Sequence, residues 1–91
     1  MEHAWCISAN QMKTVRRIYK VPAPKDIRWS KAVSLFEHLG YRMYGTGGSR
    51  VCFKKEGFPP FHMHRPHPSN HLPPEAVTEI RKYLEQIGVT P

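Results

Sequence analysis

The stretch that decides the fold is residues 41–64, YRMYGTGGSRVCFKKEGFPPFHMH, in which apolar and polar residues alternate over three short runs. The runs 41–46, 49–55 and 61–64 have the period of two that is expected of half-buried strands. The glycine-rich GTGGS between the first two runs and EGFPP before the third supply turn residues. The sequence therefore predicts a small antiparallel sheet of three strands.

The segments on both sides of this stretch have the spacing of amphipathic helices. In residues 29–40, WSKAVSLFEHLG, apolar positions recur at helical intervals, and the closing glycine suits the position after the last turn. In residues 73–88, PPEAVTEIRKYLEQIG, apolar residues form one stripe between an opening proline and a closing glycine. The order α-β-β-β-α predicts an α+β domain, with both helices on one face of a three-stranded antiparallel sheet.

Strand alternation divides the predicted sheet into two faces. The apolar set should pack under the helices, and it comprises Tyr41, Met43, Val51, Phe53, Phe61 and Met63. The opposite set should lie on the uncovered face, and it comprises Arg42, Tyr44, Arg50, Cys52, Lys54, His62 and His64. Since the second set gathers cations, imidazoles and an aromatic ring, the function is expected on that face.

The charge of the chain indicates the kind of partner. Fourteen Lys and Arg stand against seven Asp and Glu, which gives a net charge of +7. A basic balance of this size favours a polyanionic partner such as nucleic acid. No apolar run approaches the roughly 20 residues that span a bilayer. The start of the chain lacks the pattern of a signal peptide, so a cytoplasmic protein is expected. Two cysteines are too few for a disulfide framework.

Residues 1–28 are expected to form a basic N-terminal arm ahead of a domain at 29–91. Within the arm, residues 12–25, MKTVRRIYKVPAPK, mix basic and apolar residues and end in a Pro-Ala-Pro linker that cannot continue a helix. A solvated tail and a docked segment are both compatible with this composition.

Residues 61–74, FHMHRPHPSNHLPP, hold four of the six histidines and allow three interpretations. A metal site is disfavoured, because the segment has no cysteine or carboxylate to complete a ligand shell and cations lie nearby. A proline-stiffened loop with structural histidines is favoured for His71, and it is as plausible as a functional role for His62. The third interpretation is acid–base chemistry on RNA, which supplies its own 2′-hydroxyl nucleophile and needs no metal or cofactor.

Residues 26–91 resemble the HicA toxins of bacterial type II toxin–antitoxin systems. The matching features are a first helix ending in Leu-Gly, a glycine turn leading into GSRVCF, the HRPHP segment and a closing helix ending in QIGV. Their order and spacing carry the resemblance. It implies a double-stranded-RNA-binding-domain-like fold and an mRNA interferase, an endoribonuclease. It also implies a HicB-like antitoxin partner bound over the active face.

The chain departs from the HicA pattern at one position. HicA proteins commonly carry their catalytic histidine after Gly-Ser in the second strand, where this chain has Arg50. Arginine stays protonated and cannot act as a general base. Either nearby histidines have taken over that role, or the chain binds RNA without cutting it. We favour the first alternative, in which His64 and His67 share the proton transfers and Arg50 holds the scissile phosphate.

The remaining basic and aromatic residues near this site are expected to contact the flanking RNA. These predicted RNA-binding residues are Arg42, Tyr44, Lys54, Lys55, His62 and Arg65.

Overall fold

The structure is a computed structural model that describes residues 5–91. Its elements in chain order are α1 (Ala9–Ile18), α2 (Trp29–His38), β1 (Arg42–Gly47), β2 (Arg50–Lys54), β3 (Phe61–His64) and α3 (Pro74–Ile87). The strands form one antiparallel sheet in the order β1-β2-β3. The predicted α-β-β-β-α order and α+β class are therefore confirmed, with one further helix ahead of them.

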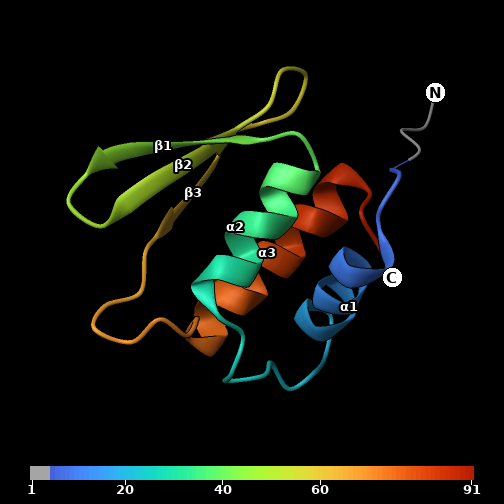
Figure 1. The fold of residues 1–91 in the computed structure, drawn as a ribbon, viewed down its shortest axis with the longest axis horizontal. Coiled ribbons are helices and arrows are strands. Elements are labelled where there is room, and N and C mark those ends of the chain that lie inside the picture. Colours follow the sequence, from blue (N-terminus) through green and yellow to red (C-terminus); the bar gives the residue numbers. More distant parts are fainter. Residues whose placement is uncertain (1–4) are drawn as a thin grey trace.

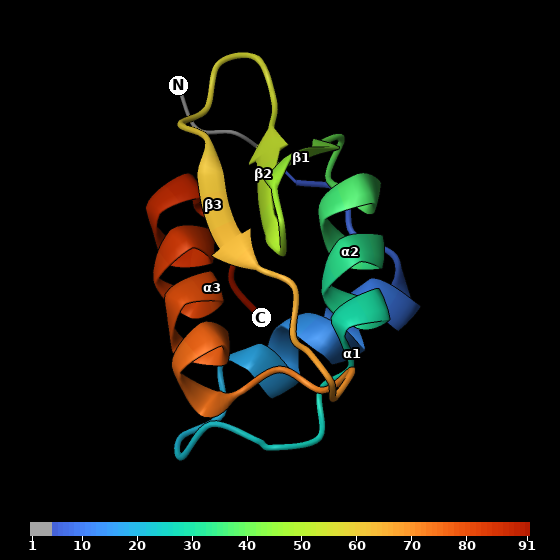
Figure 2. The same ribbon diagram turned by 90° about the vertical axis from the view of Figure 1, so that its left-hand side faces the viewer.

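The helices lie in two layers behind the sheet. Figures 1 and 2 show α2 and α3 next to each other on one side of the sheet, and α1 on the far side of this pair. The helix α1 packs against both α2 and α3. The other face of the sheet is left without a helix from the described residues, so it is the uncovered face that the alternation predicts.

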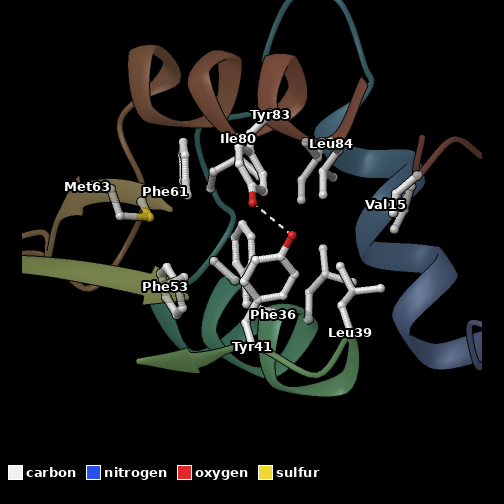
Figure 3. Packing of buried hydrophobic residues seen from close by; sticks show 14 of the residues in the cluster. Val15, Phe36, Leu39, Tyr41, Phe53, Phe61, Met63, Ile80, Tyr83 and Leu84 are labelled. Atoms are coloured by element: carbon white, nitrogen blue, oxygen red, sulfur yellow. Dashed lines mark hydrogen bonds between the residues drawn. The ribbon is translucent and has the colours of Figure 1, made fainter. Parts of the chain in front are cut away.

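The core between the sheet and the helices is built around Phe36 of α2. Its ring stacks on Phe53 of β2 with centroids 4.5 Å apart, and on Phe61 of β3 with centroids 5.5 Å apart. These rings lie close together in Figure 3, and all three are buried. Fully burying such a side chain contributes roughly 1.5–3 kcal/mol. The inward positions of β2 and β3 thus hold the helices on one face and leave the outward positions to solvent.

Two tyrosine hydroxyls meet inside this core. Tyr41 and Tyr83 lie with their Oη atoms 2.8 Å apart (Figure 3), and Tyr83 Oη donates to the carbonyl oxygen of Pro59 at 2.5 Å. Burial away from water raises the pKa of both phenols, with their mutual hydrogen bond adding to the effect at Tyr41. The pair joins the residue before β1, the loop before β3 and helix α3 through one hydrogen-bonded chain.

The N-terminal segment is a docked segment as far as the structure describes it, and residues 1–4 of the predicted arm lie outside the described residues. Ser8 caps α1 by accepting a hydrogen bond from the Gln11 amide at 3.4 Å. Val15 and Ile18 of α1 are fully buried in the core. Tyr19 Oη donates to the carbonyl oxygen of Val89 at 2.5 Å, which joins the segment to the C-terminus.

Two strand residues differ from the predicted burial. Met43 should pack under the helices but is 36% exposed, whereas Phe61 and Met63 on the other edge strand are buried as predicted. Cys52 is on the outward side yet fully buried, since the central strand places it between Tyr44 of β1 and His62 of β3. Within the described residues, no helix is long and apolar enough to cross a membrane.

Candidate functional site

The sheet register brings Arg50 and His64 together. In the pairing of β2 with β3, Arg50 stands opposite His64 and Cys52 stands opposite His62. Directly opposite residues share a face and have Cβ atoms about 4.5–5.5 Å apart. Arg50, His62 and His64 are all exposed, and they line one hollow at the end of the sheet. The hollow thus gathers a guanidinium and two imidazoles at one end of the sheet, together with Val51 and Met63 of the inward set.

The ring of His64 is oriented by the turn between β1 and β2. Its Nδ1 lies 3.4 Å from Ser49 Oγ, and the carbonyl oxygen of Ser49 accepts a hydrogen bond from the Arg65 amide at 2.7 Å. This contact uses Nδ1, and no side-chain hydrogen bond from the described residues is made by Nε2. Ser49 is not among the predicted site residues, although its place in the glycine turn beside Arg50 could have indicated it.

His62 has a different neighbour in the hollow. Its Nε2 lies 3.9 Å from the thiol sulfur of Cys52, a long and weak contact. Thr46 of β1 also lines the hollow, and this residue too is absent from the predicted set. The two histidines stand two residues apart on β3 and share a face, so their backbones are about 7 Å apart.

Cations continue along the same face toward the other end of the sheet. Arg42 of β1 stands opposite Lys54 of β2, and the Lys54 ammonium lies 5.6 Å from the centroid of the Tyr44 ring. All three side chains are exposed. We use the name open face for the set Arg42, Tyr44, Arg50, Lys54, His62 and His64.

Lys55, a predicted RNA-binding residue, lies away from the open face. Its ammonium donates to the carbonyl oxygen of Leu39 at 2.7 Å and lies 5.3 Å from the centroid of the Trp5 ring. Leu39 is the C-cap of α2, and a cation there offsets the partial negative charge of the helix end. The structure therefore places Lys55 in a contact that stabilises the fold.

The loop after β3 carries two further predicted residues away from the hollow. The Arg65 guanidinium lies over the Trp29 ring, 5.8 Å from its centroid. His67 lines a separate hollow with Lys25 and His71. The loop is pinned to the start of α2, because the Trp29 amide donates to the Asn70 carbonyl oxygen at 2.7 Å.

His71 is held in place through its backbone, and its side chain is exposed. Its backbone pairs with Arg28 in an isolated bridge, and its amide donates to Ser69 Oγ at 3.0 Å. Across residues 5–91, no three His, Cys, Asp or Glu side chains are grouped as a metal site requires. The structure thus assembles Arg50, His62 and His64 and places His67 elsewhere.

Comparisons with known proteins were made for the whole chain. The family model described as the HicA toxin of bacterial toxin–antitoxin systems matches residues 29–89, which run from the start of α2 to just beyond the end of α3. The search of curated proteins and the search of solved structures find no significant match. Because the family match covers most of the chain and every element of the predicted α-β-β-β-α domain, the chain belongs to the HicA toxin family of bacterial toxin–antitoxin systems.

Proposed function

We propose that this HicA-family toxin acts as a metal-independent endoribonuclease on mRNA, with its active site at the Arg50 end of the open face. The observation that carries the proposal is the direct pairing of Arg50 with His64, on an exposed face that also holds His62. A cation for the phosphate and two proton carriers are the groups that cleavage of RNA by its own 2′-hydroxyl requires.

The reaction follows from these groups. One imidazole removes the proton of the 2′-hydroxyl, and the 2′-oxygen attacks the adjacent phosphorus. The bond from phosphorus to the 5′-oxygen breaks, and a second, protonated imidazole gives its proton to the leaving oxygen. The products are a 2′,3′-cyclic phosphate and a 5′-hydroxyl. Arg50 stabilises the charge that develops on the non-bridging oxygens through its forked donors.

His64 is the first proton carrier in this scheme, because it stands opposite Arg50. His62 is the second, since it lines the same hollow, whereas His67 lies in the separate hollow beside Lys25. This assignment replaces the predicted pairing of His64 with His67 on geometric grounds. Arg42 and Lys54 would hold flanking phosphates, and the exposed Tyr44 ring would stack on a base.

The test is incubation of the purified protein with single-stranded RNA in excess EDTA. We expect fragments that end in a 2′,3′-cyclic phosphate, and no fragments from the His64→Ala variant at equal concentration. Cleavage that requires added divalent metal would contradict the proposal.

A second candidate function is supported by Arg50 itself, which stands where the family commonly has its catalytic histidine. On this alternative the open face binds RNA without cutting it. This alternative would be favoured if the wild type binds RNA tightly but leaves it intact after long incubation.

We also propose that a HicB-like antitoxin covers the open face in the cytoplasm. An open ribonuclease site is harmful to its own cell, and burying Arg42, Arg50 and Lys54 without partners would cost several kcal/mol for each charge. The antitoxin should therefore present carboxylates to these residues, with fast and salt-sensitive association.

A further inference from the structure

A second basic surface lies between α1 and α2. Figure 1 shows α1 on the far side of α2 and α3 from the sheet. The basic surface is a hollow of about 570 Å³ with cationic side chains from both helices. Lys13 and Arg17 come from α1, while Arg28 and Lys31 come from the start of α2. We use the name α1–α2 groove for this hollow. It includes residues of α1, which lies outside the family match at 29–89.

The charge of the α1–α2 groove is largely unbalanced. Asp26 is the one carboxylate in its lining, against four cations, so the formal charge is 4 − 1 = +3. Arg17 pairs with Asp26, and this hydrogen bond holds the pKa of the carboxyl below its usual range. Within residues 5–91 this is the only ion pair, which leaves Lys13, Arg28 and Lys31 without a carboxylate partner. An anionic ligand would relieve their mutual repulsion.

The neutral residues of the groove indicate the chemistry of that ligand. Asn10, Gln11 and Ser34 line it, and Gln11 Nε2 donates to Ser34 Oγ at 2.9 Å between the two helices. Its one large apolar residue, Ile27, is 3% exposed. The core of a protein interface is enriched in aromatic and apolar anchors, whereas phosphates are contacted by Lys, Arg, Ser, Asn and Gln. The lining therefore fits a sugar–phosphate backbone better than an acidic protein.

The loop after β3 connects the two basic surfaces. It leaves the open face at His64, passes Trp29 with the Arg65 guanidinium over the ring, and bridges to Arg28 of the groove through His71. Figure 2 shows this loop running from β3 past the lower end of α2 to α3. Lys25, on the same edge, lines the hollow that contains His67. Basic and imidazole side chains thus line a path from one surface to the other.

We propose that the α1–α2 groove is a second RNA-binding site, which holds the backbone of the same RNA strand after it leaves the open face. The inference rests on the proposed function in taking RNA as the ligand, but it does not require cleavage. It assigns to α1 a task that the family-matched domain alone does not perform. The groove adds affinity for long RNA, and it leaves the chemical step to the residues of the open face.

The test compares two double variants that remove the same charge. Lys13→Gln with Lys31→Gln takes two cations from the groove. The matched control, Arg16→Gln with Lys82→Gln, takes two exposed cations from α1 and α3 that do not line it. Binding of fluorescent single-stranded RNA is measured by anisotropy over a range of salt concentrations, with thermal melting to show that both variants are folded.

The groove variant should bind a long RNA roughly tenfold more weakly than the wild type, and its salt slope should fall by about 1.4, or 0.7 for each lost phosphate contact. The control should change much less. For an RNA of about 4 nucleotides, near the smallest site size of single-strand binders, both variants should match the wild type, because such an RNA occupies the open face alone.

Three outcomes would overturn this inference alone. Equal losses in the two variants would show a diffuse charge effect, and an unchanged groove variant would show that RNA avoids the groove. Weaker antitoxin binding with unchanged RNA binding would make the groove a protein site. These outcomes leave the proposed function intact as long as the wild type binds and cleaves RNA. A wild type that binds no RNA would overturn both proposals, and one that binds without cleaving would overturn the enzyme alone.

Discussion

Arg50 of β2 and His64 of β3 stand directly opposite each other in the antiparallel sheet, on the face left open by the described helices. A residue that cannot accept a proton thus lies within reach of one that can. Under the proposed function, this pairing would supply a proton carrier beside the arginine that follows Gly-Ser. It also makes the roles of the two residues separable by substitution.

The histidines of the hollow should be needed for chemistry and dispensable for folding. We expect His64→Ala and His62→Ala each to lower cleavage by roughly 10²–10⁴, the usual contribution of general acid–base catalysis. Both side chains are exposed, so thermal melting should change little. His67→Ala should retain most activity. If His62→Ala cleaves RNA normally and His67→Ala does not cleave it, then His67 of the loop is the second proton carrier.

Arg50 should act through the forked geometry of its donors as well as through its charge. Arg50→Lys keeps the charge but loses the bidentate contact to the phosphate, so cleavage should fall, and Arg50→Ala should lose more. The rate of RNA cleavage at saturating RNA measures both variants. Higher activity in Arg50→His than in the wild type would instead identify this chain as a weakened form of the usual HicA site.

The antitoxin should bind the open face through carboxylates. The charge reversal Lys54→Glu should weaken the complex with a HicB-like protein. It should also make the association rate of the complex depend less on salt. Lys82→Glu on α3 is the matched control, because Lys82 is equally a surface lysine. A complex that still binds RNA as well as the free toxin would place the inhibitory contact on another surface.

Removing either hydroxyl of the tyrosine pair should destabilise the protein, and the two losses should differ in size. Tyr83→Phe leaves the buried Tyr41 hydroxyl without its partner and the Pro59 carbonyl without its donor, so we expect a loss of about 1–3 kcal/mol in the free energy of unfolding. Tyr41→Phe keeps the contact from Tyr83 to Pro59 and should cost about 0.5–1.5 kcal/mol. Chemical denaturation measures both, and an equal loss would contradict this hydrogen-bond order.

The same pair predicts a dependence of stability on pH. Folding raises the pKa of Tyr41 and Tyr83 above the ordinary value of 10.0, so the folded state favours the protonated phenols. The contribution of the two phenols to the free energy of unfolding is fully present below pH 10. It is lost as the pH rises through their pKa values in the folded state. Tyr41→Phe should therefore flatten the decline in melting temperature above pH 10.

Helix α1 should contribute to the stability of the whole chain. Val15 and Ile18 are fully buried against the family-matched domain, so deleting residues 1–20 should lower the melting temperature sharply. The single change Ile18→Ala should cost about 2–5 kcal/mol, whereas Arg16→Ala on the exposed side of the helix should stay within about 0.5 kcal/mol. A truncated chain with unchanged melting would show that α1 docks without stabilising the domain.

Local patterns in the sequence determined the helices and strands of the 29–91 segment and the two faces of the sheet. The period of two in β2 predicted that Phe53 points inward and Arg50 outward, and the burial of the structure agrees. Such predictions succeed because periodicity and turn residues act within a few positions of the chain. Helix α1 is not among the predicted elements, since its apolar residues Val15 and Ile18 stand among basic residues that resemble a solvated tail.

Tertiary structure decided which of the predicted site residues line one hollow and which lie apart. The sequence brought His64 and His67 into one hypothesis because they are neighbours in the chain, but the loop is pinned to Trp29 and places His67 in another hollow. Lys55 follows Lys54 directly in the chain, but the position of α2 places the Leu39 carbonyl oxygen where the Lys55 ammonium donates to it. The α1–α2 groove likewise joins Lys13 to Lys31 by helix packing. Contacts between distant segments depend on how buried surfaces fit together, and no local pattern encodes that fit.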